Sequence, residues 1–151
     1  MSLERALELY IKEHAVKKRD IKETETISLP KHLRLGRMGE DIACEYLVSN
    51  DYEIIDRNVR YRWGEIDIIA KDSETCDLVF VEVRTRTIGK IMPPDKTVGP
   101  EKLKKLIRSC RTWVENKQYS AFWRIDLLAI TVKEDNSYDT EHIKNITEAI
   151  L

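Results

Sequence analysis

The fold is decided by residues 64–86, whose sequence is GEIDIIAKDSETCDLVFVEVRTR. Two short apolar runs rich in Ile and Val lie within it, at residues 66–70 and 78–83, and the polar residues 72–77 join them. Runs of this length and composition, separated by a polar turn, are typical of a β-hairpin. We therefore expect two antiparallel strands at the centre of the domain.

An acidic residue interrupts each run, Asp67 in the first and Glu82 in the second. Side chains alternate between the faces of a strand, so Asp67 shares a face with Glu65 and Ile69, and Glu82 shares one with Arg84. Because adjacent strands lie about 4.8 Å apart, the two carboxylates can converge on one small volume. There they would repel each other and lose solvation, and a bound divalent cation would relieve both costs.

The alternative is a solvated sheet face, on which Asp67 and Glu82 pair with Arg84 and Arg86 across the ladder. Strand patterning alone favours neither interpretation.

The chain on either side of this hairpin predicts helices and further strands. Apolar stripes of helical period predict helices at residues 33–50 and 100–117, and Pro100 suits the first turn of the second helix. Strands are expected at residues 52–60 and 122–133, and the last one follows a crossover helix, so it should pair parallel to its neighbour. This order predicts an α/β domain with a mixed β-sheet flanked by helices in three layers.

Residues 1–30 are expected to be an extension that precedes the domain at residues 31–151. An apolar stripe predicts a helix at residues 3–17, and a charged linker continues to Pro30. Three roles stay open for this helix: docking on the domain, pairing with a partner chain, or detachment. In the next helix, Gly36 and Gly39 are poor helix formers, which is unusual unless something packs closely against them.

Charge is distributed unevenly along the chain. The net charge is −1, but residues 84–111 contain nine Lys or Arg and two acids. Localised positive charge can bind phosphates even on a neutral chain. The alternative is an ordinary solvated helix face, which charge counting alone slightly favours.

Composition indicates a soluble protein in a reducing compartment. No apolar run approaches the ~20 residues needed to span a bilayer, and the first residues lack the apolar core of a signal peptide. The three cysteines are widely spaced and match no zinc motif. We expect a cytoplasmic protein with no membrane partner.

The order Asp67 … Glu82-Val83-Arg84 resembles the PD-(D/E)XK motif of restriction-endonuclease-like nucleases. Over roughly residues 33–149 the chain also resembles the YraN family of bacterial proteins, whose core is similar to that of archaeal Holliday-junction resolvases. The ordered motifs that carry this likeness lie at residues 36–40, 57–58, 64–67, 80–86, 102, 125–127 and 142–145.

The resemblance implies roles for four acids. Asp67 and Glu82 would bind a metal ion, Mg²⁺ or Mn²⁺, and Glu40 would be an additional acid supplied by the helix. Glu65 would lie at the rim as an auxiliary ligand or an orienting group.

The resemblance also implies roles for basic residues. Arg84 stands where many nucleases of this fold have lysine, and arginine stays charged, so it can only stabilise or clamp an anion. Lys102 could act as the donor instead, in the role that this lysine has in other nucleases of the fold. Contacts with the nucleic-acid backbone are expected from Arg86, Lys104, Lys105 and Arg108.

The leading hypothesis is therefore a metal-dependent phosphodiesterase acting on nucleic acid, on DNA rather than RNA, with branched DNA among the candidate substrates. Two alternatives stay open. One is a nucleic-acid-binding module that keeps the fold without turnover, and the other is a protein-interaction scaffold that uses the N-terminal helix. Self-association of the chain into a homodimer also stays open.

Overall fold

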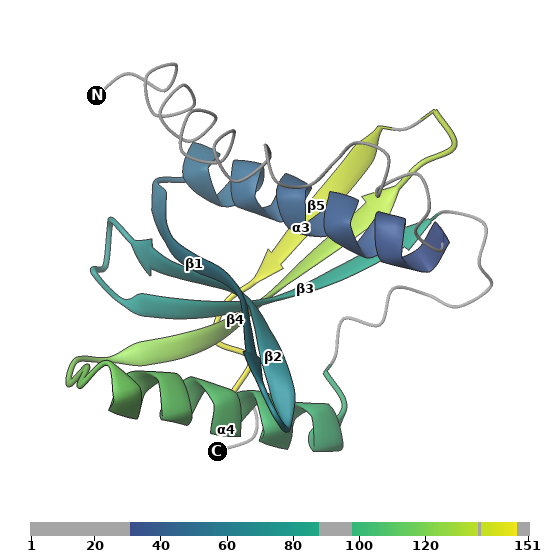
Figure 1. Cartoon of the computed structure of the whole chain (residues 1–151). Coiled ribbons are helices and arrows are strands. Elements are labelled where there is room, and N and C mark those ends of the chain that lie inside the picture. Colours follow the sequence, from purple (N-terminus) through teal and green to yellow (C-terminus); the bar gives the residue numbers. More distant parts are fainter. Residues whose placement is uncertain (1–30, 88–97, 136, 148–151) are drawn as a thin grey trace, which may run out of the picture.

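The structure is a computed structural model that describes residues 31–87, 98–135 and 137–147. One five-stranded sheet forms the middle layer, and a helix lies on each face (Figure 1). The predicted helix at residues 3–17 and its linker lie outside the described residues, as do residues 88–97. In chain order the elements are α3 (Lys31–Ser49), β1 (Tyr52–Tyr61), β2 (Gly64–Asp72), β3 (Leu78–Thr87), α4 (Pro100–Asn116), β4 (Trp123–Val132) and β5 (Tyr138–Ile143).

The strands follow chain order across the sheet, from β1 to β5. β1, β2 and β3 form an antiparallel meander, and β4 then pairs parallel to β3 after the crossover through α4. β5 returns antiparallel along β4. The prediction of a mixed sheet flanked by helices is confirmed, including the parallel pairing of the strand after the crossover helix.

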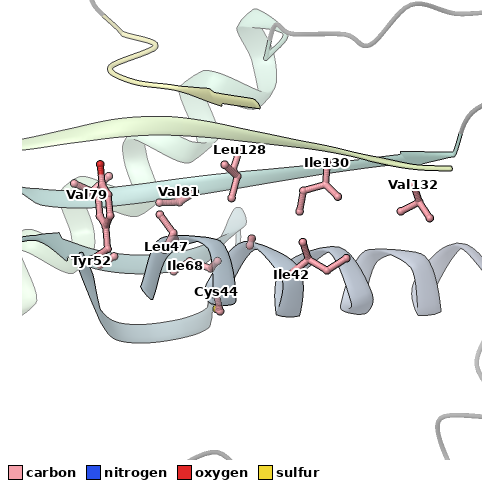
Figure 2. Close-up of a cluster of buried hydrophobic side chains, with 12 residues drawn as sticks. Ile42, Cys44, Leu47, Tyr52, Ile68, Val79, Val81, Leu128, Ile130 and Val132 are labelled. Atoms are coloured by element: carbon pink, nitrogen blue, oxygen red, sulfur yellow. The ribbon is translucent and has the colours of Figure 1, made fainter. Parts of the chain in front are cut away.

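Two apolar cores hold the three layers together, because buried strand residues alternate between the faces of the sheet. On the α3 side, Ile42 and Leu47 point from the helix towards Val81, Leu128 and Ile130 of the sheet (Figure 2). Cys44 and Ile68 are buried in the same cluster. On the α4 side, a second cluster is built from Leu106, Cys110 and Trp113 of the helix and Ile69, Phe80 and Ile125 of the sheet. Both faces of the central strands are therefore buried, which explains their nearly continuous apolar sequence.

A buried network around Arg124 fastens one end of the sheet. This guanidinium is 7% exposed and donates to the carboxylates of Asp72, Asp77 and Asp126 and to the hydroxyl of Tyr52. Asp126, which is fully buried, also contacts His142 Nε2 at 2.8 Å and accepts from the Asn145 backbone.

Each acid in this network is compensated. Burial alone would raise the pKa of Asp72, but hydrogen bonds from Arg124 and from the backbone at Glu74 and Thr75 hold it at about 2. The pKa of Asp126 is likewise lowered, against its burial, by His142 and Arg124. The network joins the β2–β3 connection to β4 and β5, which is a structural role.

Helix α3 approaches β3 most closely at Gly39. A Cβ added there would lie 1.7 Å from Thr85 Oγ1 and 2.8 Å from Thr85 Cβ, whereas a Cβ added at Gly36 would meet nothing within 4 Å. The two glycines that look alike in the sequence therefore have different roles. Only Gly39 lets the helix pack against the sheet.

Gly39→Ala should destabilise the protein by about 1–3 kcal/mol, because α3 must move away from Thr85 to accommodate the methyl group. Gly36→Ala is the matched control and should stabilise the protein by up to ~1 kcal/mol, since alanine is the better helix former. Urea denaturation of both variants measures the two effects. Equal stability of the two variants would contradict the close approach.

Candidate functional site

Asp67 and Glu82 face each other at a fork between β2 and β3. The ladder between these strands runs from Lys71↔Leu78 to Ile68↔Val81 and ends there, so its next step would pair the two acids. Instead, Asp67 Oδ2 accepts a hydrogen bond from the Val83 backbone at 2.8 Å. The carboxylate thus takes the place of the strand carbonyl that would otherwise satisfy this N–H.

Beyond the fork, β2 turns towards α4. Alternation would place Ile66 on the α3 side with Ile68, but Ile66 packs in the α4-side cluster. The start of the strand also lies against α4, where a Cβ added at Gly64 would be 3.5 Å from Ser109 Oγ. The bend opens the sheet at the position of the two acids.

Both carboxylates are nearly excluded from water, since Asp67 is 8% exposed and Glu82 is 2% exposed. Burial raises the pKa of Asp67 to about 8, and repulsion from Glu82 adds to the increase. The hydrogen bond from Val83 and the charge of Lys102 oppose this increase only in part. Near neutral pH, Asp67 therefore holds a proton for much of the time.

Two cations lie against Glu82. The Lys102 ammonium reaches it from the first turns of α4, and Arg84 Nε lies 3.7 Å from the same oxygen, Oε1. This oxygen is buried and makes no hydrogen bond of good geometry in the described part of the chain. Its partners therefore act through charge rather than through directional bonds, and Lys102 can leave easily because its side chain is 54% exposed.

The other two acids of the predicted ligand set, Glu40 and Glu65, each have a different partner. Glu40 is half-buried on α3 and accepts a hydrogen bond from the Asn58 side chain, and burial is the main cause of its raised pKa. The negative charge of Glu40 helps to raise the pKa of Asp67, and the negative charge of Glu65 helps to raise the pKa of Glu40. Glu65 is exposed and pairs with Arg60 at 3.5 Å. The structure thus opposes Asp67 and Glu82 at the fork, while Glu40 and Glu65 have partners of their own.

In residues 31–87, 98–135 and 137–147, no group of three or more His, Cys, Asp or Glu side chains is arranged to hold a metal ion. Two carboxylates are nevertheless a donor set that suits Mg²⁺, which commonly uses one or two carboxylates and takes its other ligands from water and phosphate. The buried Glu82 Oε1 lacks a directional partner, as expected of a ligand atom. Asp67 and Glu82 thus fit such an ion.

The basic residues expected to contact nucleic acid lie mostly along α4. Lys104 is exposed and pairs loosely with Glu101, Lys105 lies beside Gly64, and Arg108 lies on the ring of Trp63. Arg86 follows Arg84 on β3 and is half-buried.

Sequence reasoning missed two features of the site. It gave no role to Tyr61 or Trp63, whose rings stack on each other beside α4. It also gave no role to Asn58, which holds Glu40 and has a positive φ of 52°. Two aromatic residues flanking Arg62 in a short turn were the available signal for the first feature.

Fold and site together define a mixed α/β domain with a buried acid pair at a sheet fork, consistent with a nuclease-like fold. Residues 39–130 match the profile described as "Uncharacterised protein family UPF0102". The chain belongs to this family, which is the YraN family that its sequence motifs resemble.

Curated relatives support the assignment. A UPF0102 protein of Geobacter metallireducens is 41% identical over 115 residues, which cover 76% of this chain and 92% of the relative. One from Geobacter sulfurreducens is 41% identical over 76% of this chain and 88% of its own length. One from Christiangramia forsetii is 35% identical over 78% of this chain and 96% of its own length. The names of these relatives state no activity.

Neither helix in the described part of the chain has the combination of length and apolar character that crossing a membrane requires.

Asp67 should make the free energy of unfolding depend on pH. Its pKa is about 8 in the folded protein and about 4 in an unfolded chain, so the folded state binds the extra proton between these values. Stability contributed by the protonated group is therefore lost as the pH rises from about 4 to 8, by at most about 1.4 kcal/mol per pH unit.

Urea denaturation with EDTA at several pH values between 5 and 8 tests this dependence. Asp67→Asn carries a permanently neutral amide that still accepts from Val83, so its stability should fall less steeply with pH than that of the wild type. Parallel pH profiles for the two proteins would mean that Asp67 is already ionised.

Proposed function

We propose that this protein is a metal-dependent nuclease that hydrolyses phosphodiester bonds in nucleic acid, with DNA as the preferred substrate. The observation that carries the proposal is the Asp67–Glu82 pair, because two opposed buried carboxylates are costly for a purely structural role. The buried acids of the Arg124 network differ from this pair, because cations and hydrogen bonds compensate their charge. At the fork, Asp67 is compensated chiefly by a proton.

Asp67 and Glu82 would hold Mg²⁺ or Mn²⁺, which would lower the pKa of a bound water and neutralise charge on the phosphate. Asp67 must release its proton to act as a ligand, and Glu82 must exchange its contact with Lys102. The ammonium of Lys102 then lies free beside the site, where it can stabilise the phosphate during cleavage. Arg84 stays charged throughout and holds the phosphate instead of taking a proton.

Branched DNA is the substrate class that the resemblance to Holliday-junction resolvases suggests. The exposed cations of α4, Lys104, Lys105 and Arg108, would bind the sugar–phosphate backbone. Binding should therefore weaken steeply with salt.

A second candidate function is a nucleic-acid-binding module without turnover. The observation that favours it is the pairing of both Lys102 and Arg84 with Glu82. If these cations stay in place, the acid pair is neutralised by the protein and needs no ion.

Cleavage of single-stranded, duplex, flapped and branched DNA, and of RNA, with Mg²⁺ or Mn²⁺ tests the proposal. Product should form only with metal, and Asp67→Asn or Glu82→Gln should lower the rate by at least about 100-fold, which corresponds to ~2.7 kcal/mol of lost transition-state stabilisation. Lys117→Ala, which removes an exposed cation at the far end of α4, is the control and should cleave normally. Metal-independent cleavage, or full activity in Asp67→Asn, would exclude this site.

Lys102→Met should bind Mn²⁺ about fivefold more tightly than the wild type, because a partly exposed ion pair of ~1 kcal/mol no longer competes for Glu82. The same variant should be less stable in EDTA, since Glu82 loses its main partner. Calorimetric titration with Mn²⁺ at fixed pH measures the affinity, and Lys117→Met is the matched control. Unchanged affinity in Lys102→Met would show that this lysine does not occupy the metal position.

A further inference from the structure

The tip of the β1–β2 hairpin rests on α4, away from the rest of the sheet (Figure 1). A Cβ added at Gly64 would lie 3.7 Å from Lys105 Cβ, and Tyr61 joins the apolar cluster under the helix. The turn thus brings residues 61–64 beside the basic face of α4.

At this junction Tyr61, Trp63 and Arg108 form a stack. The Tyr61 and Trp63 rings are parallel within 4°, with centroids 5.4 Å apart, and Arg108 Cζ lies 4.0 Å from the centre of the Trp63 ring. An exposed arginine normally samples many rotamers, and ordering it costs entropy. Here the indole fixes the guanidinium before any ligand arrives.

Trp63 has a further unusual property. Its Nε1–H is buried and has no hydrogen-bond partner among the described residues. A buried donor without a partner is rare and calls for an explanation. The position of the Trp63 ring is therefore explained by its stacking on Tyr61 and Arg108 and not by a hydrogen bond.

Beside the stack, a groove of about 470 Å³ runs along α4. Three cations and a single carboxylate line it, together with Thr112 and the apolar Ile107. The cations are Lys104, Arg108 and Arg111, and the carboxylate is Glu115.

We propose that Trp63 is a positioning residue for Arg108, and that this groove binds the sugar–phosphate backbone of the nucleic-acid strand that flanks the cleaved bond. The inference rests on the proposed function and names the contact surface of that site. Trp63 acts through Arg108 and does not touch the reacting atoms.

The spacing along α4 agrees with this occupant. Lys104, Arg108 and Arg111 follow one another at intervals of four and three residues, so they lie on one face of α4, and Lys104 and Arg111 are about 10 Å apart along the helix axis. A nucleic-acid strand advances about 3.4 Å per nucleotide, so this face can follow about three nucleotides. A guanidinium forms two parallel hydrogen bonds with phosphate and with carboxylate alike, so it is the regular spacing of the three cations that favours a nucleic-acid backbone over an acidic peptide of irregular spacing.

The test is binding of the full chain, in EDTA, to fluorescent single-stranded, duplex and flapped DNA, measured by anisotropy at several salt concentrations. Arg108→Ala should weaken binding by about tenfold and reduce the salt slope by about 1. Trp63→Ala should weaken binding about three- to fivefold, and Trp63→Phe should restore it, because phenylalanine keeps a ring under the guanidinium. Lys117→Ala is the matched loss of charge outside the groove and should bind as the wild type does.

The double variant separates positioning from a general structural effect. If Trp63 acts through Arg108, Trp63→Ala should have almost no effect in the Arg108→Ala background. Additive losses, or failure of Trp63→Phe to restore binding, would overturn the positioning role. Thermal unfolding of each variant checks that the hairpin stays folded.

The two proposals fail in different ways. If the wild type binds DNA but Arg108→Ala and Trp63→Ala bind equally well, the groove is not the contact surface and the nuclease proposal stands. If the wild type binds none of the DNA probes at low salt, both proposals are wrong. Competition by poly-glutamate as strong as by DNA, lost in Arg108→Ala, would assign the groove to an acidic protein instead.

Discussion

The structure depends on a carboxylate pair placed where two strands of one sheet separate. Burying uncompensated charge costs several kcal/mol per ion, so the chain must offset this cost at Asp67 and Glu82. Asp67 keeps a proton with a pKa of about 8 and accepts the Val83 N–H, whereas Glu82 draws two cations. Each of these compensations can be exchanged for another ligand, unlike the interlocked bonds around Arg124. The site is therefore stable enough to fold and still able to bind an ion.

The topology explains why the fork opens on one side only. β3 pairs with β4 over its whole length, from Leu78↔Trp123 to Thr87↔Val132, while its ladder with β2 ends at Ile68↔Val81. Glu82 is consequently fixed in the sheet by its parallel neighbour when β2 bends away. The crossover then sets α4 against the same face, which brings Lys102 to Glu82, and Lys104, Arg108 and Arg111 line the groove along this helix.

Strand alternation and the crossover rule were enough to predict the sheet and its mixed pairing. For Asp67 and Glu82 they allowed convergence and a solvated face equally, and the resemblance to the PD-(D/E)XK motif was what favoured convergence. Features that depend on bends and packing angles were beyond the sequence. The position of Glu40 follows from how α3 lies on β1 and from the positive φ of Asn58. Glu65 pairs with Arg60, the residue opposite it on β1, and the strand register that places them together was not predicted. Gly36 and Gly39 look equivalent in the chain, and only the approach of Thr85 distinguishes them.

The parallel pairing of β3 with β4 has a consequence for the order of folding. β1, β2 and β3 are contiguous hairpins whose contacts close short loops, whereas β4 must find β3 across the whole α4 crossover. Short loops close faster and at lower entropic cost, so we expect the meander to form first. A chain in which only the meander had formed would leave Glu82 without Lys102 and without the cover of β4. Ionic contact with the arriving helix would then favour the last pairing, and the residues proposed for chemistry would also help the chain to reach its final topology.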